Sequence, residues 1–252
     1  MPDHEPFARI IILISANAEW QALSSLPGYR PPINRVHGRT NAGDTPFGEW
    51  FQKQIGGVST IFVHGGWGKI SAAASTQYVI DHYTPWLLVN LGTCGGFSGQ
   101  VERGSILLVD STLVYDIFEK MGDYEEALRY YTTELDLNWL GTGLPSGISR
   151  SLLVSADRDL LPEDIQRLKQ RYGAIAGDWE SGAINWVADR NHVPCLILRG
   201  VTDLVDEEGG EAYGNYDLFF RRTRDVMEKL TSSLPWFIER FLKSHSQSIN
   251  QQ

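Results

Sequence analysis

Short apolar runs alternate with amphipathic segments along this chain of 252 residues. Helical spacing of apolar residues predicts a long helix over residues 217–242, kinked or broken at Pro235, and shorter helices after Lys69 and near Asp178. Because strands covered by helices produce this alternation, the pattern predicts an α/β fold. Runs rich in Val, Ile and Leu predict buried strands at residues 10–14, 60–64, 86–90, 105–109, 152–155 and 194–199.

The chain is long enough for one large core, and it contains no internal repeat or interdomain linker. We therefore expect a single domain over residues 1–252, with its core at about 9–242. The polar residues 243–252 are expected to form a frayed tail. Residues 29–46 and 121–147 are long irregular stretches, which in compact domains often serve as binding loops or interface arms.

The charge and the cysteine content of the chain limit which partners and which cellular compartment we expect. The formal net charge is -9 and the basic residues are scattered, so we expect neither nucleic acid nor an anionic membrane as a partner. The first apolar run is too short for a membrane span and has no cleavage site, so nothing directs export. Cys94 and Cys195 are too few for a disulfide framework. These features predict a cytoplasmic protein, with a single bridge between the two cysteines as an alternative.

Glu19 follows the first predicted strand, in a turn of small residues that leads into a helix. Ligands of open α/β sheets bind at the carboxyl ends of the strands, and a carboxylate there also gains from the helix dipole. We therefore treat Glu19 as a candidate catalytic residue. The alternative is an ordinary acidic residue in the first helical turn.

Glycine-rich segments follow two more of the predicted strands. Residues 90–96 offer backbone N–H groups and the hydroxyl of Thr93 to a ligand, or they form only a tight turn between strand and loop. Residues 66–69 resemble half of a phosphate-binding loop but lack the full GxxxxGK[ST] spacing, so we expect no nucleoside triphosphate site. Lys69 is then expected near a helix start for local reasons.

Two further acidic segments complete the candidate site. Glu180 opens a predicted helix, and a carboxylate there can accept two hydrogen bonds, as the vicinal hydroxyls of a ribose require; Asp178 is expected to cap the helix. Asp203 follows a buried strand, and apolar neighbours would raise its pKa enough for a general acid. Alternatively, Arg199 pairs with Asp203 and lowers that pKa.

Other chemistries find little support in the sequence. The histidines show no ligand spacing, so we predict no metal, and no other cofactor is indicated. There is no GxSxG motif, and a small buried thiol is the more common role for Cys94 than a nucleophile. No GxGxxG motif follows the first strand, which disfavours a dinucleotide-binding protein.

Taken in order, residues 66–69, 90–96, 178–183 and 199–203 resemble motifs of the nucleosidase and phosphorylase family that includes 5′-methylthioadenosine/S-adenosylhomocysteine nucleosidases. The resemblance covers about residues 9 to 242. It implies a three-layer α/β/α sandwich around a twisted mixed, mostly parallel sheet. Members of the family form dimers, trimers or hexamers, and a homo-oligomer, preferably a dimer, is expected here.

The resemblance also implies a role for each acidic residue. Asp203 would protonate N7 of a purine, Glu180 would hold the ribose hydroxyls, and Glu19 would deprotonate the attacking water. Thr93 stands where nucleosidases place a serine near that water. Because no second carboxylate is placed as a nucleophile, direct displacement by water is favoured over a covalent intermediate.

The resemblance makes Asn90 the residue that distinguishes hydrolysis from phosphorolysis, because phosphorylases of the family usually carry a phosphate-binding arginine at this position. Asn90 together with Glu19 therefore indicates hydrolysis of a purine nucleoside or 5′-thionucleoside, a small-molecule partner. A phosphate-dependent phosphorylase and a non-catalytic binding or storage protein remain the alternatives. Retention of the three carboxylates disfavours the storage role.

The expected base pocket departs from the family pattern. Asp159 replaces an aromatic residue that stacks on the purine, and Trp179 replaces a methionine that lines the ribose. Asp157 matches an acid that supports base recognition, and Tyr216 matches an aromatic residue that closes the pocket. The full set of expected substrate-binding positions is Thr93, Cys94, Gly95, Asp157, Asp159, Leu160, Asp178, Trp179, Thr202 and Tyr216.

Overall fold

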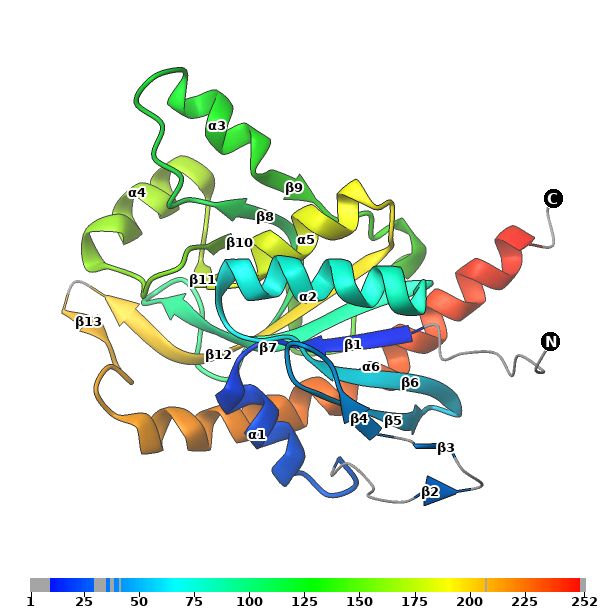
Figure 1. Cartoon of the computed structure of the whole chain (residues 1–252). Coiled ribbons are helices and arrows are strands. Elements are labelled where there is room, and N and C mark those ends of the chain that lie inside the picture. The colour runs from blue at the N-terminus through cyan, green and yellow to red at the C-terminus, as the bar shows by residue number, and fades with distance from the viewer. Residues whose placement is uncertain (1–9, 30–34, 37–38, 41, 207, 250–252) are drawn as a thin grey trace.

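A computed structural model describes residues 10–29, 35–36, 39–40, 42–206 and 208–249. Each predicted strand is present, and Figure 1 shows them as one twisted sheet between helices. The corresponding strands are β1 (Ile10–Ile14), β6 (Val58–His64), β7 (Leu87–Phe97), β8 (Ile106–Val114), β10 (Ile148–Ser155) and β12 (Cys195–Asp206).

Strands β7 and β12 extend well beyond their apolar runs. The alternative of a tight turn at residues 90–96 is wrong, because these residues continue β7 and pair in parallel with β12 as far as Phe97. Glycine makes this possible, since a Cβ on Gly96 would lie 2.5 Å from the Val101 side chain and 2.8 Å from that of Val201. The glycines thus keep the two strands paired while side chains crowd against them.

The sheet is mixed, as expected, and it closes on itself at one end. The order of its 11 strands is β13-β12-β8-β10-β11-β7-β1-β6-β5-β4, with β9 paired to β8 and an additional pairing between β12 and β7. The last pairing makes a closed ring of β7, β11, β10, β8 and β12. The strands that the sequence did not predict are β4 (Ala42–Asp44), β5 (Glu49–Ile55), β9 (Thr132–Glu134), β11 (Ala176–Asp178), β13 (Gly209–Gly210) and the separate pair β2 (Arg35–Val36) and β3 (Arg39–Thr40).

Helices cover both faces of the sheet and complete the expected three-layer sandwich (Figure 1). Helices α2 (Gly68–Tyr83) and α5 (Ser181–Arg190) pack together on one face, while α1 (Asn17–Ser25) and α6 (Tyr216–Ile249) pack together on the other. The stretch 121–147, expected to be irregular, contains α3 (Tyr124–Tyr130), β9 and the short 3-10 helix η1 (Asn138–Leu140). Helix α4 (Pro162–Tyr172) follows β10.

The end of the chain differs from the predicted frayed tail. Helix α6 continues through Pro235 to Ile249, so neither a break at Pro235 nor a tail from Lys243 is correct for the described residues. The His245 ring stacks on Phe241 at 5.5 Å and lies 5.3 Å from the ring of Trp86. These contacts pack part of the polar segment against Trp86.

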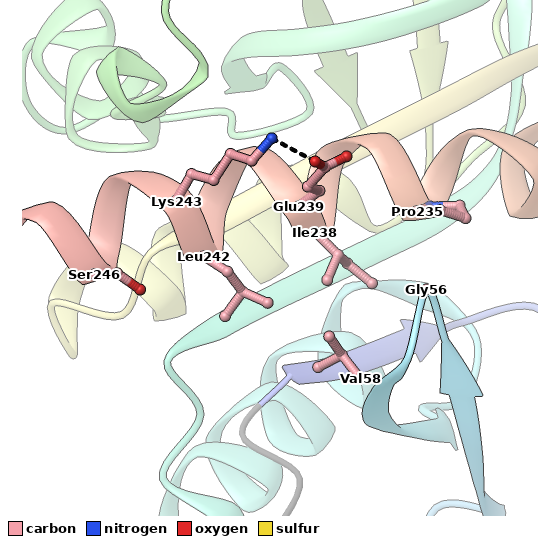
Figure 2. Close-up of a pocket in the computed structure, with 8 residues that line it drawn as sticks. All are labelled: Gly56, Val58, Pro235, Ile238, Glu239, Leu242, Lys243 and Ser246. Atoms are coloured by element: carbon pink, nitrogen blue, oxygen red, sulfur yellow. Dashed lines mark hydrogen bonds and ion pairs between the residues drawn. The ribbon is translucent and has the colours of Figure 1, made fainter.

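A groove lies between the C-terminal half of α6 and the turn that joins β5 to β6 (Figure 2). Because β6 begins at Val58, this groove is at the opposite edge of the sheet from the carboxyl end of β6. Its volume is about 360 Å³, and it is lined by Gly56, Val58, Pro235, Ile238, Glu239, Leu242, Lys243 and Ser246. Among the described residues, no helix has both the length and the apolar character that crossing a membrane requires.

Candidate active site

Glu19 lies in the first turn of α1 and faces strand β7. The backbone N–H and the hydroxyl of Thr93 both donate to Glu19 Oε1, at 2.5 and 2.9 Å, and the Ala16 N–H donates to Oε2 at 3.2 Å. The residue is 4% exposed, and burial raises its pKa despite the opposing charge of Arg199 and these hydrogen bonds. The two interpretations of Glu19 are therefore compatible: it lies in the first turn of a helix, and its carboxylate also contacts Thr93 near the carboxyl end of β7.

Gly92 allows two charged groups to approach β7 closely. A Cβ at this position would lie 2.7 Å from Glu19 Oε1 and 3.1 Å from Arg199 Nη1. Any side chain here would displace the carboxylate or the guanidinium. Glycine at this position therefore allows Glu19 and Arg199 to pack closely against β7.

Arg199 is the largest fully buried side chain of the structure, and it pairs with Asp178 at 2.8 Å. It also donates to Asn90 Oδ1, whose amide group in turn donates to the Leu13 carbonyl at 2.8 Å. The alternative pairing of Arg199 with Asp203 is wrong. The register of β12 against β7 shifts between Val201 and Asp203, so the regular alternation that would place residues 199 and 203 on the same face is broken.

Asp178 is fully engaged by protein donors. The Ser155 hydroxyl donates to Oδ1 at 2.6 Å, and the Ser181 hydroxyl and N–H donate to Oδ2 at 2.5 and 3.1 Å. Asp178 ends strand β11, three residues before α5 begins, and it still reaches the N–H of the first helical residue. The predicted capping contact is therefore present, although the N-cap position itself belongs to Glu180.

Glu180 is buried at the start of α5, with 6% of its surface exposed. The Gly68 N–H donates to Glu180 Oε1 at 3.0 Å, across the turn that precedes α2. Burial, followed by the negative charges of Asp178 and Glu19, raises the pKa of Glu180 to about 8. No described residue donates a hydrogen bond to Oε2, so this oxygen is available to a ligand.

Asp203 lies on β12 opposite Gly95 of β7. Its Oδ1 accepts from the Thr202 hydroxyl at 2.9 Å, and Asp203 is 6% exposed. Burial raises its pKa; the Thr202 hydrogen bond and the charge of Arg222 oppose the change. Glu19 also meets β7, through Thr93, and Glu180 follows β11, whose Ala176 and Gly177 pair with Gly96 and Gly95 of β7. The three predicted carboxylates therefore lie on segments that meet the carboxyl end of β7.

Trp179 stacks on Trp67, with ring centroids 4.9 Å apart and planes at 29°. Trp67 is 62% exposed and stands between Gly66 and Gly68, so the pair forms an aromatic surface beside Glu180. Sequence reasoning missed Trp67. The only signal for it in the sequence was a large aromatic side chain between two glycines.

Several expected substrate-binding residues have other partners. Asp157 accepts from the Lys69 N–H at 2.7 Å, and Leu160 is buried with its side chain against Gly95. Asp159 is exposed, and its contact with a base stays a prediction. Tyr216 is 62% exposed, and its ring stacks on a neighbour in α6.

The two cysteines are buried and free, so the alternative of a bridge between them is wrong. Burial raises the pKa of the Cys94 thiol far above its usual range and that of Cys195 to about 12. A thiol that stays protonated is a poor nucleophile, which disfavours covalent chemistry at Cys94. The Thr202 hydroxyl donates to the Cys94 carbonyl at 3.4 Å. Within the described ranges, no group of His, Cys, Asp and Glu side chains is arranged to hold a metal ion.

Fold and site together define a class: an α/β/α sandwich in which buried carboxylates surround one central strand. The chain belongs to the phosphorylase superfamily, whose family model matches residues 9–234. The match includes every segment that contributes to the site.

Individual relatives show what the chain is similar to. It is 24% identical over 180 residues to the 5′-methylthioadenosine/S-adenosylhomocysteine nucleosidase of Tolumonas auensis, covering 67% of this chain and 78% of that protein. Against the nucleosidase of Halalkalibacterium halodurans it is 26% identical over 184 residues, covering 68% and 78%. The crystal structure of the Helicobacter pylori nucleosidase with butyl-thio-DADMe-Immucillin-A gives a TM-score of 0.71 at 16% identity, covering 91% of this chain and 99% of that one. This similarity establishes the fold.

Proposed function

We propose that this protein hydrolyses the N-glycosidic bond of a purine nucleoside or 5′-thionucleoside, releasing the free base and the sugar. The observation that carries the proposal is the gathering of Glu19, Glu180 and Asp203 around the end of β7, each buried and each with a raised pKa. The relatives' names supply the substrate class, since they are nucleosidases of 5′-methylthioadenosine and S-adenosylhomocysteine.

Asp203 acts as the general acid. Burial favours its protonated form, so it can give a proton to N7 of the purine as the bond between the sugar and the base breaks. The electron pair of the broken bond leaves with the base, which departs neutral because it has received this proton. The Thr202 hydroxyl fixes the orientation of the carboxyl group.

Glu180 binds the sugar. Its Oε1 is held by the Gly68 N–H, which leaves Oε2 for the ribose hydroxyls. In its ionised form, which predominates only above its pKa of about 8, Glu180 also stabilises the positive charge that develops on the sugar ring as the base leaves. The stacked rings of Trp67 and Trp179 supply an apolar surface next to this position.

Glu19 activates the attacking water. Its raised pKa makes it a better proton acceptor than an ordinary surface carboxylate, and Thr93 holds one of its oxygens. The water loses a proton to Glu19 and forms the new bond to the sugar carbon.

Water is favoured over phosphate by the surroundings of Asn90. Its side chain is bonded to Arg199 and to the Leu13 carbonyl, and Arg199 is itself paired with Asp178. Neither group is free to bind a phosphate dianion. The rival phosphorylase would need a phosphate site built from other residues.

A panel of nucleosides and 5′-thionucleosides, incubated with and without inorganic phosphate, tests both the reaction and its acceptor. We expect base release that does not depend on phosphate, with free sugar as the second product. Strict phosphate dependence would identify a phosphorylase. If no member of the panel is cleaved, the proposal that the protein is an enzyme is wrong.

The variant Asp203→Asn tests the general acid. It should lower kcat on the best purine substrate by about 10²–10⁴-fold, because the amide cannot donate the proton. The control is Asp189→Asn, an exposed position on α5, which should keep full activity. Melting temperatures of both variants show whether the fold is kept.

The nucleosidase is also proposed to be a cytoplasmic homo-oligomer, preferably a dimer. Free cysteines support the location. Large apolar side chains support the assembly: Ile70, Phe118 and Met121 are 85%, 74% and 97% exposed.

A further inference from the structure

Lys69 joins three segments of the chain at the entrance to α2. Its N–H donates to Asp157 Oδ1 at 2.7 Å, and its ammonium group bonds to Asp116 and lies 3.9 Å from Asp157 Oδ2. The Asp157 N–H donates to Asp116 Oδ2 at 3.0 Å. Lys69, Asp116 and Asp157, here called the Lys69 clamp, thus tie the start of α2 to the segments that follow β8 and β10.

The clamp is better shielded from solvent than an ordinary surface ion pair. The side chains of Lys69 and Asp116 are each 19% exposed, and that of Asp157 is 39% exposed. Exposed ion pairs contribute little because water screens them, whereas partly buried ones are screened less. The contacts also include two backbone N–H groups, which fix the course of the main chain.

Gly68 is the residue that the clamp holds in place. It has a φ of +81°, and a Cβ here would lie 3.2 Å from Asp157 Oδ1. Its N–H donates to Glu180 Oε1, and the next N–H along the chain, that of Lys69, donates to Asp157. Consecutive N–H groups therefore point to two different carboxylates, so the geometry of one bond constrains the other.

We propose that Lys69 is a positioning residue: through the clamp it keeps the Gly68 N–H on one oxygen of Glu180, and so directs the other oxygen to the substrate ribose. The inference deepens the proposed function and rests on it for the identity of the ligand. It gives Lys69 a role even though residues 66–69 are not a phosphate-binding loop.

The charges around Glu180 determine how its pKa responds to loss of the clamp. Asp178 and Glu19 raise the pKa of Glu180, and the Gly68 hydrogen bond and Arg199 lower it. Loosening Gly68 removes a donor to the ionised form, so the pKa of Glu180 should rise further. The ionised form binds the ribose hydroxyls, so activity at acidic and neutral pH should fall.

The experiment compares Lys69→Met and Asp116→Asn with Lys243→Met, which breaks an exposed lysine pair with Glu239 on α6. The pH dependence of kcat/KM is measured on a nucleoside that the wild type cleaves. We expect both clamp variants to move the acidic limb to higher pH and to lower kcat/KM at pH 7 about tenfold. Lys69→Arg should recover part of the loss, and Lys243→Met should behave as the wild type. An acidic limb that stays in place in both clamp variants would overturn the proposal.

A second readout does not need activity. Carbon-13 NMR of the glutamate carboxyl groups, with the Glu180 signal assigned from Glu180→Gln, gives its titration midpoint directly. A higher midpoint in Lys69→Met and Asp116→Asn than in the wild type supports the clamp, and equal midpoints contradict it. If the wild type cleaves no nucleoside, the proposed function fails while this titration still decides the role of Lys69.

Discussion

At the scale of single residues, the site depends on a guanidinium that no solvent reaches. Arg199 is 1% exposed, and a buried charge is tolerated only when it is paired and hydrogen-bonded. Asp178 supplies the charge, and Asn90 supplies an acceptor. The guanidinium also offsets the negative charge of the neighbouring glutamates, because its positive charge lowers the pKa values of Glu19 and Glu180 against the effect of burial.

Removing this guanidinium should destabilise the whole protein. Arg199→Met leaves Asp178 buried without its counter-charge, and we expect the free energy of unfolding to fall by about 3–5 kcal/mol. Urea unfolding followed by circular dichroism measures the change. The matched control is Arg224→Met, at an exposed position on α6, which should shift stability by no more than about 0.5 kcal/mol. Equal stability of the two variants would show that the pair is dispensable.

At the scale of elements, the approach of α6 to the sheet is set by a glycine. A Cβ on Gly200 of β12 would lie 2.2 Å from Val226 Cγ1 on α6. Gly200→Ala should therefore push α6 away from the strand that carries Asp203, and cost about 1–3 kcal/mol of stability. Thermal and urea unfolding measure the loss.

Two further variants make this prediction specific. Gly122→Ala is the control, because the nearest atom to a Cβ there is a side-chain carbon at 4.0 Å. Adding Val226→Ala to Gly200→Ala removes the clashing methyl groups and should recover part of the stability. If the double variant were no more stable than the sum of the single changes predicts, steric contact with Val226 would not be the cause.

Apolar runs predicted the central strands because burial on both faces leaves a continuous signal in the sequence. They could not predict β5, whose segment EWFQKQI carries polar residues on an exposed face near the edge of the sheet. They also ended β7 and β12 too early, since glycine and polar residues continue the ladder without an apolar signal. The length of α6 was underestimated because its last turns are polar and are held by a ring contact of His245.

The sequence predicted those site residues that stand next to the end of a strand or the start of a helix, but not the contacts between distant segments. Glu19 and Asp203 follow predicted strands, and strands ending at one edge of a sheet bring such residues together, whereas Glu180 was placed only at a helix start because β11 before it was not predicted. The contact of Gly68 with Glu180 joins residues 112 positions apart, and that of Lys69 with Asp157 joins residues 88 apart. Nothing in the local sequence encodes such partners, so the bond of Asp157 to Lys69 was not expected, and the contact of Asp157 with a base stays a prediction.

At the scale of the whole molecule, the raised pKa values link stability to pH. Glu180 has a pKa of about 8 in the folded protein against an ordinary value of 4.5, so between these limits the folded state binds more protons than the unfolded state. Its contribution to stability is complete below the lower value and is lost as the pH rises through the upper one. Glu19 and Asp203, whose pKa values are also raised, act in the same direction.

The free energy of unfolding should therefore decrease as the pH rises from about 5 to about 8, with a slope of at most about 1.4 kcal/mol per pH unit for each such group. Urea unfolding at several pH values measures it. Glu180→Gln should flatten the decrease, whereas Glu163→Gln, an exposed change in α4, should not alter the slope. A profile for Glu180→Gln that parallels the wild type would mean that Glu180 titrates near its usual pKa.

The proposed dimer would be connected to the site through the Lys69 clamp. Ile70 is next to Lys69 in α2, and Phe118 lies two residues after Asp116, so the bond between Lys69 and Asp116 places two exposed apolar side chains on segments that meet beside Glu180. Burying such surface against a second copy stabilises a dimer in proportion to the apolar area removed from water.

We expect sedimentation equilibrium to show a dimer for the wild type and a weakened association for Ile70→Glu and for Phe118→Glu, since each places a charge in the interface. Arg224→Glu is the control, because it places a charge at an exposed polar position on α6, outside residues 121–147. Because Ile70 and Phe118 lie on segments that the clamp ties beside Glu180, loss of the dimer should also raise KM for the nucleoside. A monomeric wild type would contradict the assembly, and a dimer that survives both changes would place the interface elsewhere on the surface.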